Sequence, residues 1–115
     1  MKTGTMKKLL LLGASLLFVG CAMTLPVTGQ SEDGVLTFTG TATGYLDGGG
    51  TIALVSNTGL TVEGSFVYVT NRQGEGTFKC SDGRSGPFSF VSTGTSGTGT
   101  GRLGTQRVTF SFGTR

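Results

Sequence analysis

Apolar and small polar residues alternate along the chain from Gly34 onward, and glycine interrupts the alternation every few positions. A period of two is the pattern of strands that bury one face. No window repeats apolar residues at helical spacing. The pattern therefore predicts strands at residues 35–45, 51–56, 60–70, 75–81, 85–92 and 105–112. Residues 93–101, between the last two, consist of glycine, threonine and serine.

The segments between these strands carry turn signals that suit antiparallel neighbours. Asp47–Gly48 and Asp82–Gly83 accept positive φ at low cost, and Asn57–Gly59 marks another turn. Strands joined in this way pair with their sequence neighbours, so the sheet edges must close on each other or be shielded. We expect an all-β fold, a small antiparallel meander of six or seven strands that forms a barrel or a curved sheet. Gly64, within the third strand, predicts a bulge or bend.

One face of each predicted strand supplies the expected core. Burial of each aromatic or aliphatic side chain contributes about 1.5–3 kcal/mol. Cys80 is on the same face as Phe78, so we expect it to be a buried thiol on a strand. The predicted inward residues are Leu36, Phe38, Ile52, Leu54, Phe66, Tyr68, Phe78, Phe88, Phe90, Val108, Phe110 and Phe112.

The front of the chain has a different pattern. Lys7 and Lys8 precede an apolar run, residues 9–19, which ends at Gly20–Cys21. The run is too short for a transmembrane helix, which needs about 20 residues. It fits the apolar region of a secretory signal peptide, which has about 7–15 residues.

Residues 18–21, Phe-Val-Gly-Cys, resemble the lipobox of bacterial lipoproteins, with Phe18 where an aliphatic residue is usual. The resemblance implies a signal peptide at residues 1–20, a diacylglyceryl group on the Cys21 thiol, and membrane attachment through that lipid. A non-acidic residue after the cysteine, Ala22, implies the outer membrane, facing the periplasm, by the sorting habit of enteric lipoproteins. An ordinary secretory signal cut after Ala22 and an uncleaved anchor are the alternatives.

Two further segments complete the expected organisation. Residues 21–33 have no periodicity and include Pro26 and Gly29, so we expect a flexible tether there. Residues 34–115 are expected to fold as one glycine-rich β domain.

An internal similarity links the third to fifth predicted strands. Residues 63–66, Glu-Gly-Ser-Phe, align with residues 85–88, Ser-Gly-Pro-Phe. The stretch 62–83 resembles a MORN repeat, in which Gly-x-Phe, Gly-x-Gly and Asp-Gly follow at similar spacing. The resemblance implies hairpin units stacked in a curved meander, often near membranes. Convergence within a glycine-rich meander is the alternative origin of this spacing.

The formal charge of +3 says little about the partners of the domain. Lys2, Lys7 and Lys8 precede Cys21, and the remaining chain holds six basic and six acidic side chains. The basic residues are spread singly, whereas phosphate binding requires a cluster. We therefore expect no nucleic-acid partner.

The chain has no histidine, the commonest general base and metal ligand. Cys80 therefore lacks a histidine base for nucleophilic catalysis. Glu63 and Glu75 flank one hairpin and could face each other as a hydrolase pair, but two exposed strand residues are the simpler interpretation. We expect no enzyme activity, no metal, no cofactor and no small-molecule substrate.

The most polar turn lies at residues 80–86, where Asp82 and Arg84 share one hairpin tip. The tip is either a recognition loop or a plain turn. Together these features predict a lipid-anchored cell-envelope protein with a structural or protein-interaction role and an envelope protein as its partner. The alternative is a small β-barrel lipoprotein that binds or inhibits an envelope enzyme such as lysozyme, with this loop entering the cleft.

Overall fold

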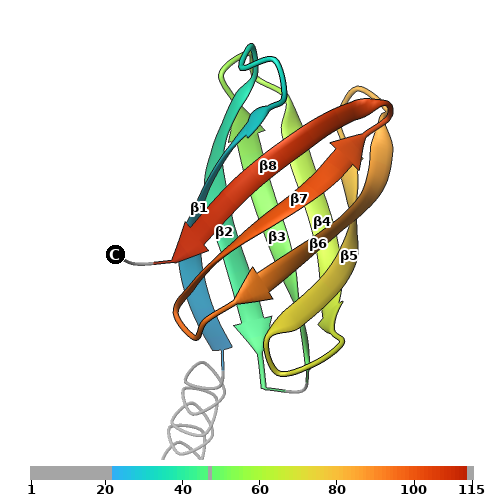
Figure 1. Cartoon of the computed structure of the whole chain (residues 1–115). Helices are drawn as coiled ribbons and strands as arrows, with labels where there is room; N and C mark the ends of the chain where they lie inside the picture. The colour runs from blue at the N-terminus through green and yellow to red at the C-terminus, as the bar shows by residue number, and fades with distance from the viewer. Residues whose placement is uncertain (1–21, 47, 114–115) are drawn as a thin grey trace, which may run out of the picture.

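The computed structural model describes residues 22–46 and 48–113, which form a closed antiparallel barrel (Figure 1). These residues contain eight strands: β1 (Ala22–Ser31), β2 (Thr37–Tyr45), β3 (Gly49–Ser56), β4 (Thr61–Tyr68), β5 (Gln73–Cys80), β6 (Ser85–Ser92), β7 (Ser96–Leu103) and β8 (Gln106–Gly113). Each strand pairs with the next along the chain. The prediction of an all-β antiparallel meander that forms a barrel is confirmed, although the strand count exceeds the six or seven expected.

The barrel closes between β1 and β8, which Figure 1 shows in blue and red. Val27 lies opposite Phe112, and Ser31 lies opposite Val108, in one continuous antiparallel register. Closure gives every described strand a partner on both sides. It thereby removes the exposed strand edges that favour aggregation.

The tether predicted for residues 21–33 is wrong for Ala22–Ser31, which form β1. Val27 is buried, and its neighbours alternate between the two faces. Pro26 lies opposite Thr41 of β2, whereas pairing with β8 begins only at Val27. The missing N–H of Pro26 is tolerated because one side of the residue has no strand partner there. The strands β2 and β8 therefore supply a context that the sequence of β1 alone does not contain.

Strand β7 was also absent from the prediction, because inward positions of this strand are glycines. An added Cβ at Gly97 would clash with the ring of Phe112, and one at Gly99 would clash with the ring of Phe110. Each glycine lies directly opposite that phenylalanine on β8. Rings of the neighbouring strand thus cover the inner surface of β7, an arrangement in which aromatic side chains compensate for strand glycines.

The same packing of phenylalanine against glycine recurs in the strands β3 to β6. Gly50 lies opposite Phe66, and Gly74 lies opposite Phe90. In both pairs an added Cβ would overlap the ring. Glycines and phenylalanines therefore work as cross-strand pairs that fill the barrel interior.

The bulge predicted at Gly64 is wrong. This residue lies in regular register between Ile52 of β3 and Phe78 of β5. An added Cβ would lie 2.6 Å from the carbonyl oxygen of Thr77, so the close approach of the strands requires glycine here.

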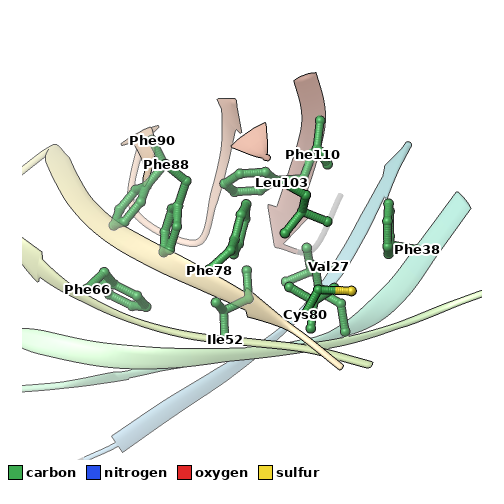
Figure 2. Close-up of a cluster of buried hydrophobic side chains, with 13 residues drawn as sticks. Val27, Phe38, Ile52, Phe66, Phe78, Cys80, Phe88, Phe90, Leu103 and Phe110 are labelled. Atoms are coloured by element: carbon green, nitrogen blue, oxygen red, sulfur yellow. The ribbon is translucent and has the colours of Figure 1, made fainter. Parts of the chain in front are cut away.

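The barrel interior is one cluster of buried apolar side chains (Figure 2). Nine of the twelve predicted inward residues are buried, and Leu36 and Phe112 are partly buried against the same cluster. Tyr68 differs, since 39% of its surface is exposed. Cys80 is buried on β5, as predicted. The prediction did not include the buried residues Val27, Val62 and Leu103.

The outer wall of the barrel is rich in hydroxyl groups. Thr24 and Thr43 are hydrogen-bonded across β1 and β2 through their hydroxyls at 3.0 Å. Thr28 lies between Thr39 of β2 and Ser111 of β8. A broad, open hollow of about 830 Å³ on this wall is lined largely by threonine and serine. Threonine and serine thus predominate around this hollow, and the exposed valines Val55, Val67 and Val91 also lie on strands of the outer wall.

Candidate functional site

The meander brings its turns to two ends of the barrel. The proximal end, where β1 begins and β8 ends, carries the turns that join β2 to β3, β4 to β5 and β6 to β7. The distal end carries the turns at residues 32–36, 57–60, 81–84 and 104–105. The two ends differ in polarity, and the proximal end is the candidate site.

A cavity of about 70 Å³ lies inside the barrel at the proximal end. Aromatic rings in edge-to-face contact line it: the ring centroid of Phe90 is 5.0 Å from that of Phe66 and 5.6 Å from that of Phe112. Tyr68 extends the cluster, 5.8 Å from Phe66. The described lining residues include no carboxylate, ammonium or guanidinium group. The cavity therefore suits an apolar group.

Large apolar side chains are exposed around the same end. Leu46 is 85% exposed, Val69 is 57% exposed and Met23 is 52% exposed. Within the described chain nine large apolar residues are exposed, and seven of them lie in the proximal turns or the adjoining strand ends: Met23, Tyr45, Leu46, Val67, Tyr68, Val69 and Val91. The other two, Val35 and Val55, lie toward the distal end. Exposed apolar surface gathered in one place is typical of a contact surface.

The distal end is closed by hydrogen bonds. Ser31 is fully buried, and its hydroxyl donates to Oδ1 of Asp33 at 2.6 Å. The backbone N–H of Leu36 donates to the Ser31 Oγ at 3.0 Å, and that of Val35 donates to Asp33 Oδ1 at 3.0 Å. The Ser31 hydroxyl is the main cause, and the Val35 N–H the second, of the lowered pKa of Asp33.

A second buried serine organises the next distal turn. The Ser56 Oγ accepts hydrogen bonds from the backbone N–H groups of Thr58 at 3.2 Å and Leu60 at 2.9 Å. Leu103, at the distal end of β7, is almost fully buried. Polar loop groups are thus paired locally, and they cover the apolar interior from this side.

The structure brings together the predicted recognition residues, Asp82 and Arg84, but they bind each other. The Arg84 Nε donates to Asp82 Oδ2 at 2.9 Å, and the Arg84 backbone N–H donates to Oδ1 at 3.0 Å. The backbone N–H of Arg84 is the main cause of the lowered pKa of Asp82, followed by the Cys80 thiol. Gly83 between them has a φ of 97°. The geometry is that of a self-contained turn.

The structure does not bring Glu63 and Glu75 together, so the prediction that they could face each other is wrong. Glu63 lies opposite Lys79, and Glu75 lies opposite Val67. The two glutamates are therefore about 13 Å apart along the hairpin, at about 3.3 Å per residue. Both are exposed on the outer wall. No paired-carboxylate site results from this arrangement.

Other predicted features fall partly outside the described residues. Cys21 and the signal peptide at residues 1–20 lie outside them. Residues 22–46 and 48–113 contain no group of three or more histidine, cysteine, aspartate or glutamate side chains that could hold a metal ion. Cys80 forms no disulfide with another residue of these ranges. In the same ranges, no helix is long and apolar enough to cross a membrane.

Sequence reasoning missed the proximal apolar surface, although part of its signal was present. Residues 67–69, Val-Tyr-Val, are three consecutive apolar residues that break the period of two immediately before a turn. Tyr45–Leu46 is a similar interruption before the preceding proximal turn. Their proximity follows only from the even up-and-down topology, which sends both turns to one end.

Comparisons with known proteins support the fold. No protein-family model and no curated protein matches the chain. A solved structure of a redesigned β-barrel, mFAP1, bound to DFHBI has a TM-score of 0.65 and 16% identity, and the match covers 79% of this chain and 92% of that chain. A de novo designed fluorescence-activating β-barrel has a TM-score of 0.58 and 18% identity, with 80% and 91% covered. At these identities the likeness concerns the fold alone.

Proposed function

We propose that this chain is a lipid-anchored protein of the bacterial cell envelope, attached through Cys21, with a structural or protein-interaction role and no catalysis. The observation that supports the proposal best is the position of the exposed apolar residues. They gather at the end of the barrel where β1 begins, and β1 begins at Ala22, one residue after the lipobox cysteine. Adjacent Cα atoms are about 3.8 Å apart, so a lipid on Cys21 is attached directly at this end.

The start of β1 also bears on where the signal peptide is cut. Ala22 lies opposite Tyr45 in the β1–β2 ladder. Cleavage before Cys21 leaves that pair intact, whereas an ordinary secretory cut after Ala22 would remove Ala22 from the ladder. The pairing of Ala22 thus supports the lipoprotein processing that residues 18–21 resemble.

Intact-mass analysis of the mature protein, purified from membranes, tests the proposal. We expect a chain that starts at Cys21 and carries a diacylglyceryl group with its acyl chains. A Cys21→Ser variant should lose the added mass and leave the membrane fraction. A mature chain that starts at Met23, or one that starts at Cys21 with an unmodified thiol, would refute the lipid anchor.

We propose the outer membrane, facing the periplasm, as the location, because Ala22 is a non-acidic residue after the cysteine. Separation of the two membranes on a density gradient tests this, with Ala22→Asp as the comparison. We expect the wild-type protein in the outer membrane and the variant in the inner membrane. Identical distributions would remove the argument from Ala22.

The proposed interaction role places a protein partner at the distal end, which projects away from the anchor. The charged residues Glu32, Asp33, Asp82 and Arg84 lie in the distal turns. The alternative function, binding or inhibition of an envelope enzyme such as lysozyme, would use the same end. Asp82 and Arg84 satisfy each other there, which weakens the argument for a loop that enters an enzyme cleft. Lysozyme activity that is unchanged by a large excess of the barrel would exclude this alternative.

A further inference from the structure

We infer that the proximal end of the barrel is itself a membrane-contact surface. It rests against the lipid headgroups, so that the barrel axis points away from the bilayer. The seating face consists of Met23, Tyr45, Leu46, Tyr68 and Val69. This inference rests on the proposed lipid anchor and adds a second contact between the protein and the membrane.

The members of the seating face come from three separate segments that the topology brings together. Ala22 and Tyr45 are paired across β1 and β2. Met23, Leu46 and Tyr68 line one surface hollow beside that pair. The face is therefore continuous across the beginning of β1 and the ends of β2 and β4.

The side chains of the seating face are better suited to contact with a lipid interface than to exposure to water. Leucine, valine and methionine gain free energy when they leave water, and tyrosine is enriched where acyl chains meet headgroups. Among the described residues of the proximal turns and adjoining strand ends, the charged residues are Arg72 and Glu75, which lies opposite Val67. Four charged residues lie in the distal turns, and Arg102 and Arg107 lie at the distal ends of β7 and β8. Apolar and charged groups are thus concentrated at opposite ends.

The position of the proposed lipid anchor indicates which partner covers the seating face. A lipidated Cys21 adjoins Ala22, so the bilayer is within one residue of the apolar surface. A protein partner would have to enter between the barrel and the membrane that holds it. A single lipid-attached residue gives a flexible link, but apolar side chains that bury beside it add a second, cooperative contact. The bilayer is therefore the occupant that the geometry favours.

The tyrosines make the inference directly measurable. The chain has two tyrosines, Tyr45 and Tyr68, and no tryptophan. Both belong to the seating face, so intrinsic fluorescence reports on this end alone. The acylated protein is reconstituted into phosphatidylethanolamine–phosphatidylglycerol vesicles with and without brominated acyl chains. We expect bromine to quench tyrosine emission, and unchanged emission would overturn the inference.

A second arm separates the seating face from the anchor. Residues 22–115 contain the described closed barrel and lack Cys21, the proposed acylation site, so vesicle flotation of this chain is independent of acylation. We expect the barrel to float with vesicles. A Leu46→Asn/Val69→Asn variant should bind them about tenfold more weakly, because two aliphatic contacts are lost. The matched control, Val35→Asn/Val55→Asn, changes two exposed valines away from the face and should bind as the wild type does.

Each outcome of this arm decides the inference. A barrel that does not float, or two double variants that bind equally, would overturn it. Size-exclusion chromatography with light scattering adds the remaining outcome: a dimer that only the proximal variant disrupts would assign the face to a second copy of the chain. Failure of acylation appears in the intact mass instead, so it is distinguished from failure of the seating face.

Discussion

At the distal end of the barrel two strands finish in buried serines, Ser31 and Ser56, whereas the proximal end has one buried serine, Ser92, and most of the exposed apolar side chains. Ser31 and Ser56 accept hydrogen bonds from backbone N–H groups of their own turns. Met23 and Leu46, at the proximal end, are each more than half exposed. The same meander therefore makes serine–turn hydrogen bonds at both ends, shorter ones at the distal end, and carries most of its exposed apolar side chains at the proximal end.

This difference indicates that the ends have different surroundings. Exposed apolar surface contributes about 25 cal/mol less stability per Å² than the same surface when buried. The proposed membrane contact would account for the apolar proximal end, because Ala22, next to the proposed lipid-carrying cysteine, lies at that end.

The largest expected effect comes from the core beneath the distal end. Phe78 is almost fully buried, and its ring stacks on that of Phe88 with centroids 4.2 Å apart. We expect Phe78→Ala to lower the free energy of unfolding in urea by about 3–5 kcal/mol. Phe112→Ala at the proximal end should lower it by about 1–2 kcal/mol, because Phe112 is only partly buried. Equal losses would break the comparison between the two ends.

Removing a hydroxyl should have a smaller effect, again larger at the distal end. Ser31→Ala leaves the Leu36 N–H and the Asp33 carboxylate without their buried partner, so we expect a loss of about 1–3 kcal/mol in urea unfolding. Ser92, at the proximal end, makes hydrogen bonds of 3.3 Å to Gly94, and Ser92→Ala should lose about 0.5–1 kcal/mol. A larger loss for Ser92→Ala would contradict the idea that serines close the distal end.

The loss of folding stability at low pH should also arise at the distal end. The folded pKa of Asp33 is lowered from 3.8, chiefly by the Ser31 hydroxyl, so its ionised form stabilises the fold. This contribution is present above 3.8 and is lost as the pH falls through 3.8 and then through the lower folded pKa. Thermal unfolding between pH 7 and pH 2 should show a shallower acid decline for Asp33→Asn. Glu32→Gln, which removes one charge from the same turn, should decline as the wild type does.

The smallest expected effect on stability is at the seating face. Leu46 is largely exposed, so Leu46→Asn should change the free energy of unfolding by no more than about 0.5 kcal/mol. A change well above that size would mean that Leu46 supports the fold instead of a contact. The combination of unchanged stability and weaker vesicle binding is what distinguishes a surface residue from a core residue.

Most of the fold could be predicted from the sequence because alternation is a local signal. The strand at residues 85–92 has the bounds expected, and the inward positions of phenylalanine are nearly all correct. Strand β7 escaped because Gly97 and Gly99 are covered by phenylalanines of β8, and that information belongs to another strand. Strand β1 was not predicted because Pro26 suggested a linker. Proline is compatible with this strand because β1 has no β8 partner at that position.

The candidate site could be predicted only in part. Asp82 and Arg84 were correctly placed together on one tip, but the sequence does not show that their charges are used by each other. The seating face consists of residues 23, 45–46 and 68–69, and only the closed topology makes them neighbours. Contacts made across a barrel end are long-range in sequence, so a local pattern does not contain them.

Hydrogen–deuterium exchange with mass spectrometry tests the central claim most directly, with the acylated protein in vesicles compared with the free barrel of residues 22–115. The account predicts slower exchange on membranes in the proximal turns at residues 46–48 and 69–72, and unchanged exchange in the distal turns at residues 32–36 and 81–84. Protection of the distal turns, or equal exchange rates at both ends in the two samples, would contradict it.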